Sequence, residues 1–118
     1  MSNSGSSKSA ARVRRRYDAQ YLDPISVRAG DRVVVGREDP EYPGWRWCTA
    51  PDERAGWVPE SFLQLEGVLG TMLRDYTARE LTVSEGAAVV IGEAVSGWLW
   101  VTDAQGRAGW IPEICVSL

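Results

Sequence analysis

The sequence predicts an all-β protein made of two small five-stranded barrels in tandem, joined by a short linker. Three observations point there: an internal repeat, many short strand-like runs, and the near absence of helical periodicity. The repeat is the strongest of them. GWRWCTAPDERAGWVPE at 44–60 recurs 53 residues later as GWLWVTDAQGRAGWIPE at 97–113, with 10 of 17 positions identical. A period near 50 residues defines the structural unit of a chain.

Short runs rich in β-branched and aromatic residues, separated by turn residues, predict five strands in each repeat. Turns every 8–12 residues are typical of small barrels and sandwiches. No stretch keeps a helical apolar pattern for three turns. The predicted strands are 11–17, 25–27, 32–36, 45–50 and 55–59 in the first repeat, and 71–76, 81–83, 87–92, 98–102 and 107–111 in the second.

Domain boundaries follow from the repeat. We expect a disordered polar and basic tail at 1–11, a first domain at 12–66 and a second at 67–118. About five linking residues within 65–70 would restrict the relative orientation of the two domains.

Alternation along each strand sends successive side chains to opposite faces and so separates core from surface. It leaves the six tryptophans largely at the surface or at the contact between the repeats, where aromatic clusters usually mark binding sites. The predicted core is Val13, Ile25, Val27, Val33, Val35, Cys48, Val58 and Leu63 in the first repeat, and Met72, Leu81, Val83, Val89, Ile91, Val101, Ile111 and Val116 in the second.

The net charge of −3 is unevenly distributed along the chain. Residues 1–16 carry +5, residues 17–66 carry −5 and residues 67–118 carry −3. The basic run at 12–16 is interpreted as a solvated first strand and leader, and alternatively as an arm for nucleic acid or a membrane surface. The acidic repeats behind it would repel phosphate, which disfavours nucleic acid.

The composition speaks against catalysis, cofactors and metals. The chain has no histidine, the usual general base and commonest metal ligand. It shows no phosphate-binding glycine motif. Cys48 and Cys115 occupy different places in their repeats, so we expect reduced thiols in a cytoplasmic protein. No signal-like segment or membrane span of ~20 apolar residues is present.

Two motifs, each present twice, carry a family resemblance. VRRRYDAQYLDPISVRAGD and MLRDYTARELTVSEGA resemble the ALYDY…ELSF…GD segment of the Src-homology-3 (SH3) family. GWxW followed by xAGW[VI]PE resembles its tryptophan strand and G-aromatic-x-P segment. The likeness covers about 12–65 and 71–118, and the whole chain resembles bacterial tandem-SH3 proteins. It implies two SH3-like barrels with aromatic grooves for extended, proline-rich peptides.

The resemblance also implies site residues. It places a ligand groove in each repeat, with loop acids that pair a basic ligand residue. Asp18, Glu38 and Asp39 are candidate acids, and Asp23 and Glu41 are the predicted ones. The predicted groove residues are Tyr17, Trp45, Trp57, Pro59 and Phe62 in the first repeat, and Tyr76, Trp98, Trp110 and Pro112 in the second. For Trp47 and Trp100 we favour structural stacking or contact between the repeats.

Departures from the family pattern make the two repeats unequal. Arg15 and Arg74 replace the first ALYDY tyrosine, and Pro24 stands where an acid is expected. The second repeat has Cys115 in place of the last aromatic, and its two long loops are shorter. We therefore expect a competent groove in the first repeat and a degraded one in the second.

The sequence thus predicts a non-enzymatic adaptor that binds a protein or an extended, proline-rich or basic peptide mainly through its first domain, as a monomer or weak homodimer. One alternative is a structural or assembly module whose aromatic faces are buried between domains or in a homodimer. Nucleic-acid binding through the basic segment is a further alternative, and no membrane partner is expected.

Overall fold

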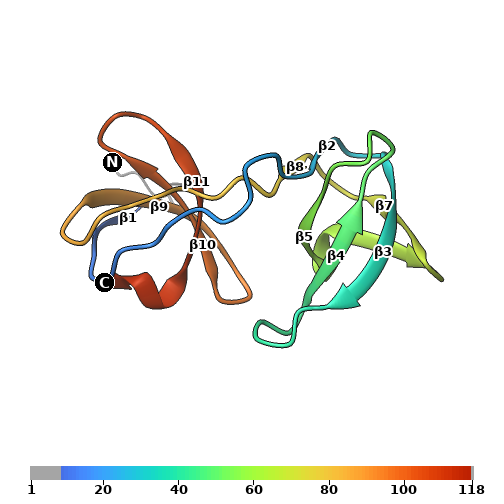
Figure 1. Cartoon of the computed structure of the whole chain (residues 1–118), viewed down its shortest axis with the longest axis horizontal. Coiled ribbons are helices and arrows are strands. Elements are labelled where there is room, and N and C mark those ends of the chain that lie inside the picture. Colours follow the sequence, from blue (N-terminus) through green and yellow to red (C-terminus); the bar gives the residue numbers. More distant parts are fainter. Residues whose placement is uncertain (1–8, 118) are drawn as a thin grey trace, which may run out of the picture. The chain divides into compact units, whose positions relative to one another are not determined.

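The computed structural model describes residues 9–117, and its chain divides into two compact units (Figure 1). Unit 2 is the continuous segment Tyr21–Arg79. Unit 1 combines the N-terminal segment through Gln20 with the segment from Glu80 onward. The polypeptide therefore passes between the units twice, after Gln20 and again after Arg79.

Unit 2 contains one five-stranded antiparallel sheet in the order β5-β4-β3-β7-β6 and a two-stranded β2–β8 ladder. Its elements are β2 (Ser26–Val27), β3 (Arg32–Glu38), β4 (Trp45–Thr49), β5 (Ala55–Pro59), the 3₁₀ turn η1 (Glu60–Phe62), β6 (Leu63–Glu66), β7 (Leu69–Met72) and β8 (Tyr76–Thr77).

Unit 1 repeats this plan in the order β11-β10-β9-β1-β12. The predicted strand at 81–83 is absent, and only Val83 forms a bridge, with Tyr17. The elements of unit 1 are β1 (Ser9–Val13), β9 (Ala88–Val95), β10 (Trp98–Asp103), β11 (Ala108–Pro112), the 3₁₀ turn η2 (Glu113–Cys115) and β12 (Val116–Ser117).

The first strands of the two repeats have exchanged places. In Figure 1, β1 lies beside β9 of the second repeat, whereas β7 lies beside β3 of the first. Ala11 is paired with Val89, and Val33 with Gly70. The structure therefore does not follow the consecutive domains 12–66 and 67–118, because each unit takes its first strand from the other repeat.

The segment between the repeats explains the exchange. β6 and β7 form a hairpin whose last pair is Glu66 and Leu69, and Gly67 supplies a positive φ of 65° in the turn. This local pairing closes a very short loop, whereas pairing β6 with β1 would close one of about 50 residues, at a greater entropic cost. Residues 65–70, predicted as the linker, are thus an internal hairpin of unit 2.

All sixteen predicted core residues are buried, but the exchange sorts them differently. Val13 packs in the core of unit 1 with Val89, Val101 and Ile111 of the second repeat. Met72, from the second repeat, is buried in unit 2, where its N–H donates to the carbonyl of Asp31. Alternation therefore predicted which side chains are buried, but not which unit buries them.

Two predictions about the sheets and the tryptophans need correction. The five-stranded sheets are open ladders, with β5 and β6 at the edges in unit 2, so the hydrogen bonds do not close a barrel. Trp45 and Trp110 are only 3% and 4% exposed, and the other four tryptophans are half-buried. Alternation assigns a side chain to a face of the sheet but does not reveal what covers that face.

The basic N-terminal segment is part of unit 1 from residue 9 onward. Residues 9–11, predicted within a tail at 1–11, belong to β1, where Ser9 pairs with Ile91, while residues 1–8 lie outside the described range. Arg12 Nη1 donates to the carbonyl of Gly86 at 3.1 Å, and Arg16 pairs with Asp18 at 2.8 Å. By sequence, the exchange leaves unit 1 neutral, with six cations and six acids, and unit 2 at −3, with seven and ten.

Candidate peptide-binding grooves

The exchange places Tyr17 against Trp98 of the second repeat. Tyr17 follows β1 and Trp98 begins β10, and their ring centroids lie 5.8 Å apart at an interplanar angle of 83°. Both side chains are half-buried. Tyr17 was predicted to share a groove with Trp45, but these two residues lie in different units.

Glu80 joins this aromatic pair. The Tyr17 hydroxyl and the Gln20 backbone N–H both donate to Glu80 Oε1, each at 2.8 Å. Burial raises the pKa of Glu80, and these two hydrogen bonds oppose the rise. Opposite Trp98 in the β10–β11 ladder is Pro112. We call Tyr17, Glu80, Trp98 and Pro112 the unit 1 groove, after the ligand groove that the family resemblance implies.

The equivalent residues of unit 2 are buried. Tyr76 and Phe62 meet edge-to-face at 5.5 Å and are 7% and 6% exposed. The Tyr76 hydroxyl donates to the carbonyl of Trp57 at 2.7 Å. Trp45 pairs with the buried Pro59. We call Trp45, Pro59, Phe62 and Tyr76 the unit 2 groove, and its burial is unlike the competent groove expected for the first repeat.

The missing ALYDY tyrosine of unit 2 is replaced by a cation. The Arg74 guanidinium lies 4.1 Å from the centroid of the Phe62 ring. In unit 1, the buried Cys115 stands at the position of the last groove aromatic. Burial raises the pKa of its thiol, and the charges of Arg15 and Arg14 only partly oppose this rise. The two grooves therefore differ in the residue at the last aromatic position as well as in exposure.

The candidate acids of the first repeat mostly hold local structure. Asp39 Oδ1 accepts from the backbone N–H groups of Glu41 and Tyr42, and Glu38 Oε2 accepts from that of Gly44. The predicted site acids Asp23 and Glu41 are both exposed, and Asp23 lies 3.4 Å from Arg54 Nη1. Both lie in unit 2, and Asp18 is the candidate acid that lies in unit 1.

Each unit also carries a cross-strand tryptophan pair. Trp47 and Trp57 are opposite one another on β4 and β5, with ring centroids 5.1 Å apart at 73°. Trp100 and Trp110 repeat this arrangement on β10 and β11 at 5.4 Å and 72°. Trp47 and Trp100, for which we favoured structural stacking or contact between the repeats, thus meet the rings of the predicted groove residues Trp57 and Trp110 edge-to-face.

The two cysteines are buried free thiols. Burial raises the pKa of Cys48 to about 11, so it stays protonated at neutral pH. Within residues 9–117, no cluster of three or more acidic or cysteine side chains could hold a metal ion. None of the helices in that range is long and apolar enough to cross a membrane.

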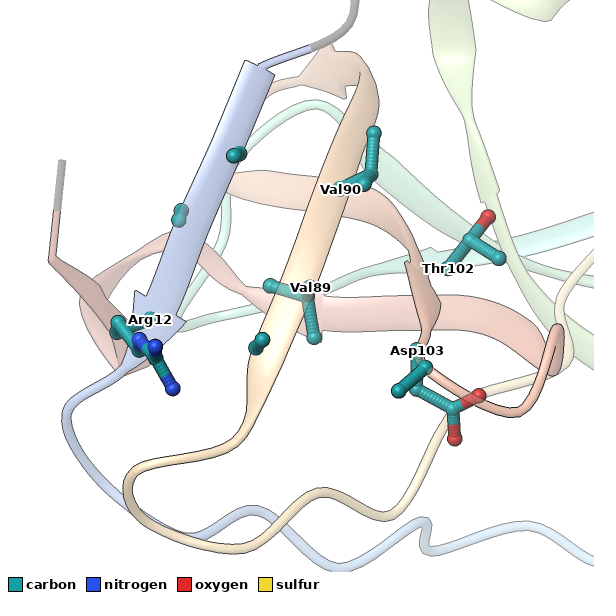
Figure 2. Close-up of a pocket in the computed structure, with 9 residues that line it drawn as sticks. Arg12, Val89, Val90, Thr102 and Asp103 are labelled. Carbon is teal, nitrogen blue, oxygen red and sulfur yellow. The ribbon is translucent and has the colours of Figure 1, made fainter.

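A shallow hollow of about 420 Å³ lies on unit 1 (Figure 2). Figure 2 shows Arg12 on β1 at one side and Thr102 and Asp103 at the other, with Val89 and Val90 of β9 between them. Asp103 is engaged by Arg107 Nε at 2.9 Å. The remaining lining is alanine, so the hollow brings together no reactive groups.

Sequence reasoning did not identify Glu80 as a site residue. The signal was available, because Glu80 precedes Leu81 in the second repeat as Pro24 precedes Ile25 in the first. This is the position where the family pattern expects an acid. Its partner Tyr17 could not be predicted, since the pairing depends on the strand exchange.

Comparison with known proteins finds a family match for the first repeat. The family described as "Variant SH3 domain" matches residues 10–66. "Myosin heavy chain IB" of Acanthamoeba castellanii is 38% identical over 48 residues, covering 41% of this chain and 4% of that protein. No solved structure matches. The chain thus spans only a small part of that relative.

The matched segment carries the ALYDY-like run, the tryptophan strand and the G-aromatic-x-P segment in the family's order. SH3 domains are generally protein-interaction modules rather than catalysts. Residues 10–66 of this all-β chain are a variant SH3 domain sequence.

Proposed function

We propose that this chain is a non-catalytic adaptor that binds an extended peptide, proline-rich or basic, through the unit 1 groove. The observation that carries the proposal is the edge-to-face pair of Tyr17 and Trp98, with Glu80 hydrogen-bonded to the Tyr17 hydroxyl. This site combines one residue of the first repeat with two of the second. It replaces the groove expected within the first repeat alone.

The chemistry of the groove supports this ligand class. Rigid aromatic rings accept a preformed polyproline helix at low entropic cost. The Trp98 and Tyr17 rings are half-buried, so each offers a part of its surface while its orientation stays fixed. The Glu80 carboxylate provides an acceptor for a ligand arginine or lysine. The two buried thiols fit the proposed cytoplasmic location.

The test is a titration of the full chain with a library of proline-rich peptides, with and without arginine, followed through the tryptophan indole N–H resonances. We expect the Trp98 resonance to move. Trp98→Ala should weaken binding by about 30-fold, because removal of a central aromatic costs about 2 kcal/mol or more. Trp100→Ala is the matched control, because it removes a half-buried tryptophan of the same unit that is not one of the groove residues. If the chain is folded and none of the peptides shifts the Trp98 resonance, the proposal is refuted.

A structural or assembly role is the second candidate, and the burial of Trp45, Phe62 and Tyr76 favours it. Such a module would use its aromatic faces for packing and need no peptide. Sedimentation over a hundredfold range of concentration tests it. A concentration-dependent dimer with no peptide response at Trp98 would favour assembly over peptide binding.

No specific observation favours nucleic acid. Arg12 and Arg16 both make contacts inside unit 1, to Gly86 and Asp18. Binding through these arginines would fall steeply with salt. A gel-shift series at increasing salt therefore tests this alternative.

A further inference from the structure

The outer edge of β6 in unit 2 is an open strand edge. β6 ends the five-stranded sheet and, in the described part of the chain, forms a ladder with β7 alone. Its last three residues, Gln64, Leu65 and Glu66, are all exposed. A strand edge presents unpaired N–H and C=O groups, which can pair with a strand of another molecule. The sheet of unit 2 can therefore continue beyond β6.

The other three sheet edges are covered by another segment or very short. At the β5 edge, the Ile25 N–H donates to the carbonyl of Ala55 at 3.1 Å. At the β11 edge, the Leu81 N–H donates to the carbonyl of Trp110 at 3.2 Å. The described β12 has two residues, against four in β6. Among residues 9–117, the β6 edge thus combines length with exposure, a combination that monomeric proteins usually avoid.

The hydrogen-bond pattern shows which backbone groups of β6 face outward. The Leu73 N–H donates to the carbonyl of Phe62 at 2.9 Å, so these two residues form a hydrogen-bonded pair. Such pairs alternate with non-hydrogen-bonded ones along an antiparallel ladder. Gln64 and Glu66 are therefore bonded to β7, and Leu65 is not. The N–H and C=O of Leu65 point away from β7, to the open edge.

The Leu65 side chain provides an apolar contact at this edge. It is 42% exposed, whereas Leu63 is buried. Alternation puts both leucines on the core side of the sheet. They lie over Gly70, where an added Cβ would be 3.2 Å from Leu63 Cδ2 and 3.7 Å from Leu65 Cδ2. A second leucine placed beside Leu65 would extend the core of unit 2 across the edge.

The sequence of β6 is complementary to itself in the antiparallel direction. When two copies are aligned with Leu65 opposite Leu65, each Gln64 stands opposite the Glu66 of the other copy. The two Leu65 residues then exchange a pair of N–H···O bonds, and their side chains meet on the core side. On the outer side, each Gln64 amide can donate to a Glu66 carboxylate. This alignment sets no acid of β6 opposite another.

We propose that β6 is a dimerisation strand, through which two copies of this chain pair antiparallel about Leu65 and join their unit 2 sheets. The contact is isologous, so it closes at two copies. It is small, and the dimer is therefore weak and depends on concentration. Each copy carries a net charge of −3, so salt should strengthen the dimer by screening the repulsion. The strand lies in unit 2, so the proposal does not depend on the unit 1 groove.

The test is sedimentation of the full chain over a hundredfold range of concentration, up to about 1 mM, at low and at high salt. We expect a monomer–dimer equilibrium that shifts toward the dimer with salt. Amide hydrogen exchange at Leu65 should slow as the concentration rises, whereas exchange at Gln64, already bonded to β7, should change little. A chain that stays monomeric, or a dimer that weakens with salt, would overturn the proposal.

Gln64→Glu tests the alignment of the two strands. It sets two carboxylates opposite one another in each of two symmetric pairs and should weaken the dimer about two- to thirtyfold, the range for two cross-strand pairs. The double variant Gln64→Glu/Glu66→Gln exchanges the two side chains and should restore the dimer. Gln105→Glu adds the same charge at an exposed position of unit 1 and is the matched control. A double variant that associates no better than Gln64→Glu would contradict the alignment.

Leu65→Lys tests the centre of the contact. It sets two like charges directly opposite one another and should abolish the dimer. Leu69→Lys is the matched control, because Leu69 is a leucine of similar exposure, 38%, on the neighbouring strand β7. A folded Leu65→Lys chain that still dimerises would overturn the proposal.

Trp98→Ala separates this proposal from the proposed function. The variant should lose proline-rich peptides and dimerise as the unsubstituted chain does. Loss of the dimer in a folded Trp98→Ala chain would assign the contact to the unit 1 groove and overturn the assignment to β6.

Discussion

Units 1 and 2 have the same strand plan but different connectivity. Unit 2 is one continuous stretch of chain, whereas unit 1 is assembled from two segments separated by the whole of unit 2. The variant SH3 match over residues 10–66 therefore spans parts of both units. The comparison teaches that the repeat in the sequence and the unit in the structure have different boundaries, because the first strand and first loop of each repeat complete the other unit.

The difference gives the two units different folding requirements. Unit 2 forms its β6–β7 hairpin locally, and its β2–β8 ladder then pairs Ser26 with Thr77. This ladder draws together the two points where the chain leaves unit 2. Folding of unit 2 thus shortens the effective loop that unit 1 must close and lowers the entropic cost of assembling it.

The largest expected effect comes from comparing two fragments of the chain. One is cut at the boundaries of a structural unit, and the other at the boundaries of a sequence repeat. The fragment 21–79 retains every strand of unit 2 and should fold alone, with amide resonances that superimpose on those of unit 2 in the full chain. The fragment 12–66 lacks β7, so β3 and β6 lose the strand between them. Its spectrum should therefore differ from that of the full chain throughout these strands.

The reverse result would contradict the strand exchange. If the spectrum of 12–66 superimposes on the full chain and that of 21–79 does not, the strands are not exchanged. Thermal melts of both fragments provide the second measurement, since a fragment that retains its unit should unfold cooperatively.

Substitutions in the exchanged strands have the next largest effect. Met72→Ala should destabilise unit 2 by about 2–5 kcal/mol, the range for removal of a buried methionine side chain, although Met72 belongs to the second repeat by sequence. Amide exchange at Val33 and Val58 reports on unit 2, and at Val89 and Val101 on unit 1. Val13→Ala, the matched substitution, should speed exchange in unit 1 instead. Faster exchange at Val89 in Met72→Ala would indicate consecutive domains.

Sequence reasoning predicted local properties well because they depend on neighbouring residues. All sixteen residues that alternation assigned to the core are buried. The exchange could not be predicted in this way. Val13 and Met72 are both apolar, each follows the same pattern, and either could complete either unit. The outcome depends on the two residues between β6 and β7.

For the unit 1 groove, too, sequence reasoning predicted most of the residues but not how they are grouped. Tyr17, Trp98 and Pro112 were each assigned to a groove, but Tyr17 was assigned to the one that it does not join. The expectation that the first repeat keeps the better groove rested on its aromatic Phe62 and its longer loops. Phe62 instead lies under Arg74, in a groove that is buried. Residue type alone does not report burial.

Gly56 and Gly109 stand at equivalent positions of the two repeats, and substituting them tests a smaller difference between the units. A Cβ at Gly109 would lie 2.7 Å from the Glu80 carbonyl carbon and 2.8 Å from the Leu81 nitrogen, both of them backbone atoms. At Gly56 it would meet the side chains of Ile25 and Ala78 at 3.0 and 3.1 Å. Gly109→Ala should thus destabilise unit 1 by about 1–3 kcal/mol, the range for overpacking, and Gly56→Ala should affect unit 2 less. Chemical denaturation measures both, and equal effects would contradict this reasoning.

The smallest expected effect is the pH dependence of unit 1. The pKa of Glu80 is raised in the folded state by burial, so the folded chain holds this proton more tightly than the unfolded chain does. The stabilisation is complete below the ordinary glutamate pKa and is lost as the pH rises through the folded-state pKa. Glu80→Gln retains an oxygen that can accept from Tyr17 and Gln20 but cannot titrate, so it should remove this slope in unit 1 and leave unit 2 unchanged. Glu113→Gln, at an exposed glutamate of unit 1, is the control. Denaturation at a series of pH values, with amide reporters in each unit, measures the slope, and a slope that persists in Glu80→Gln would assign it to another group.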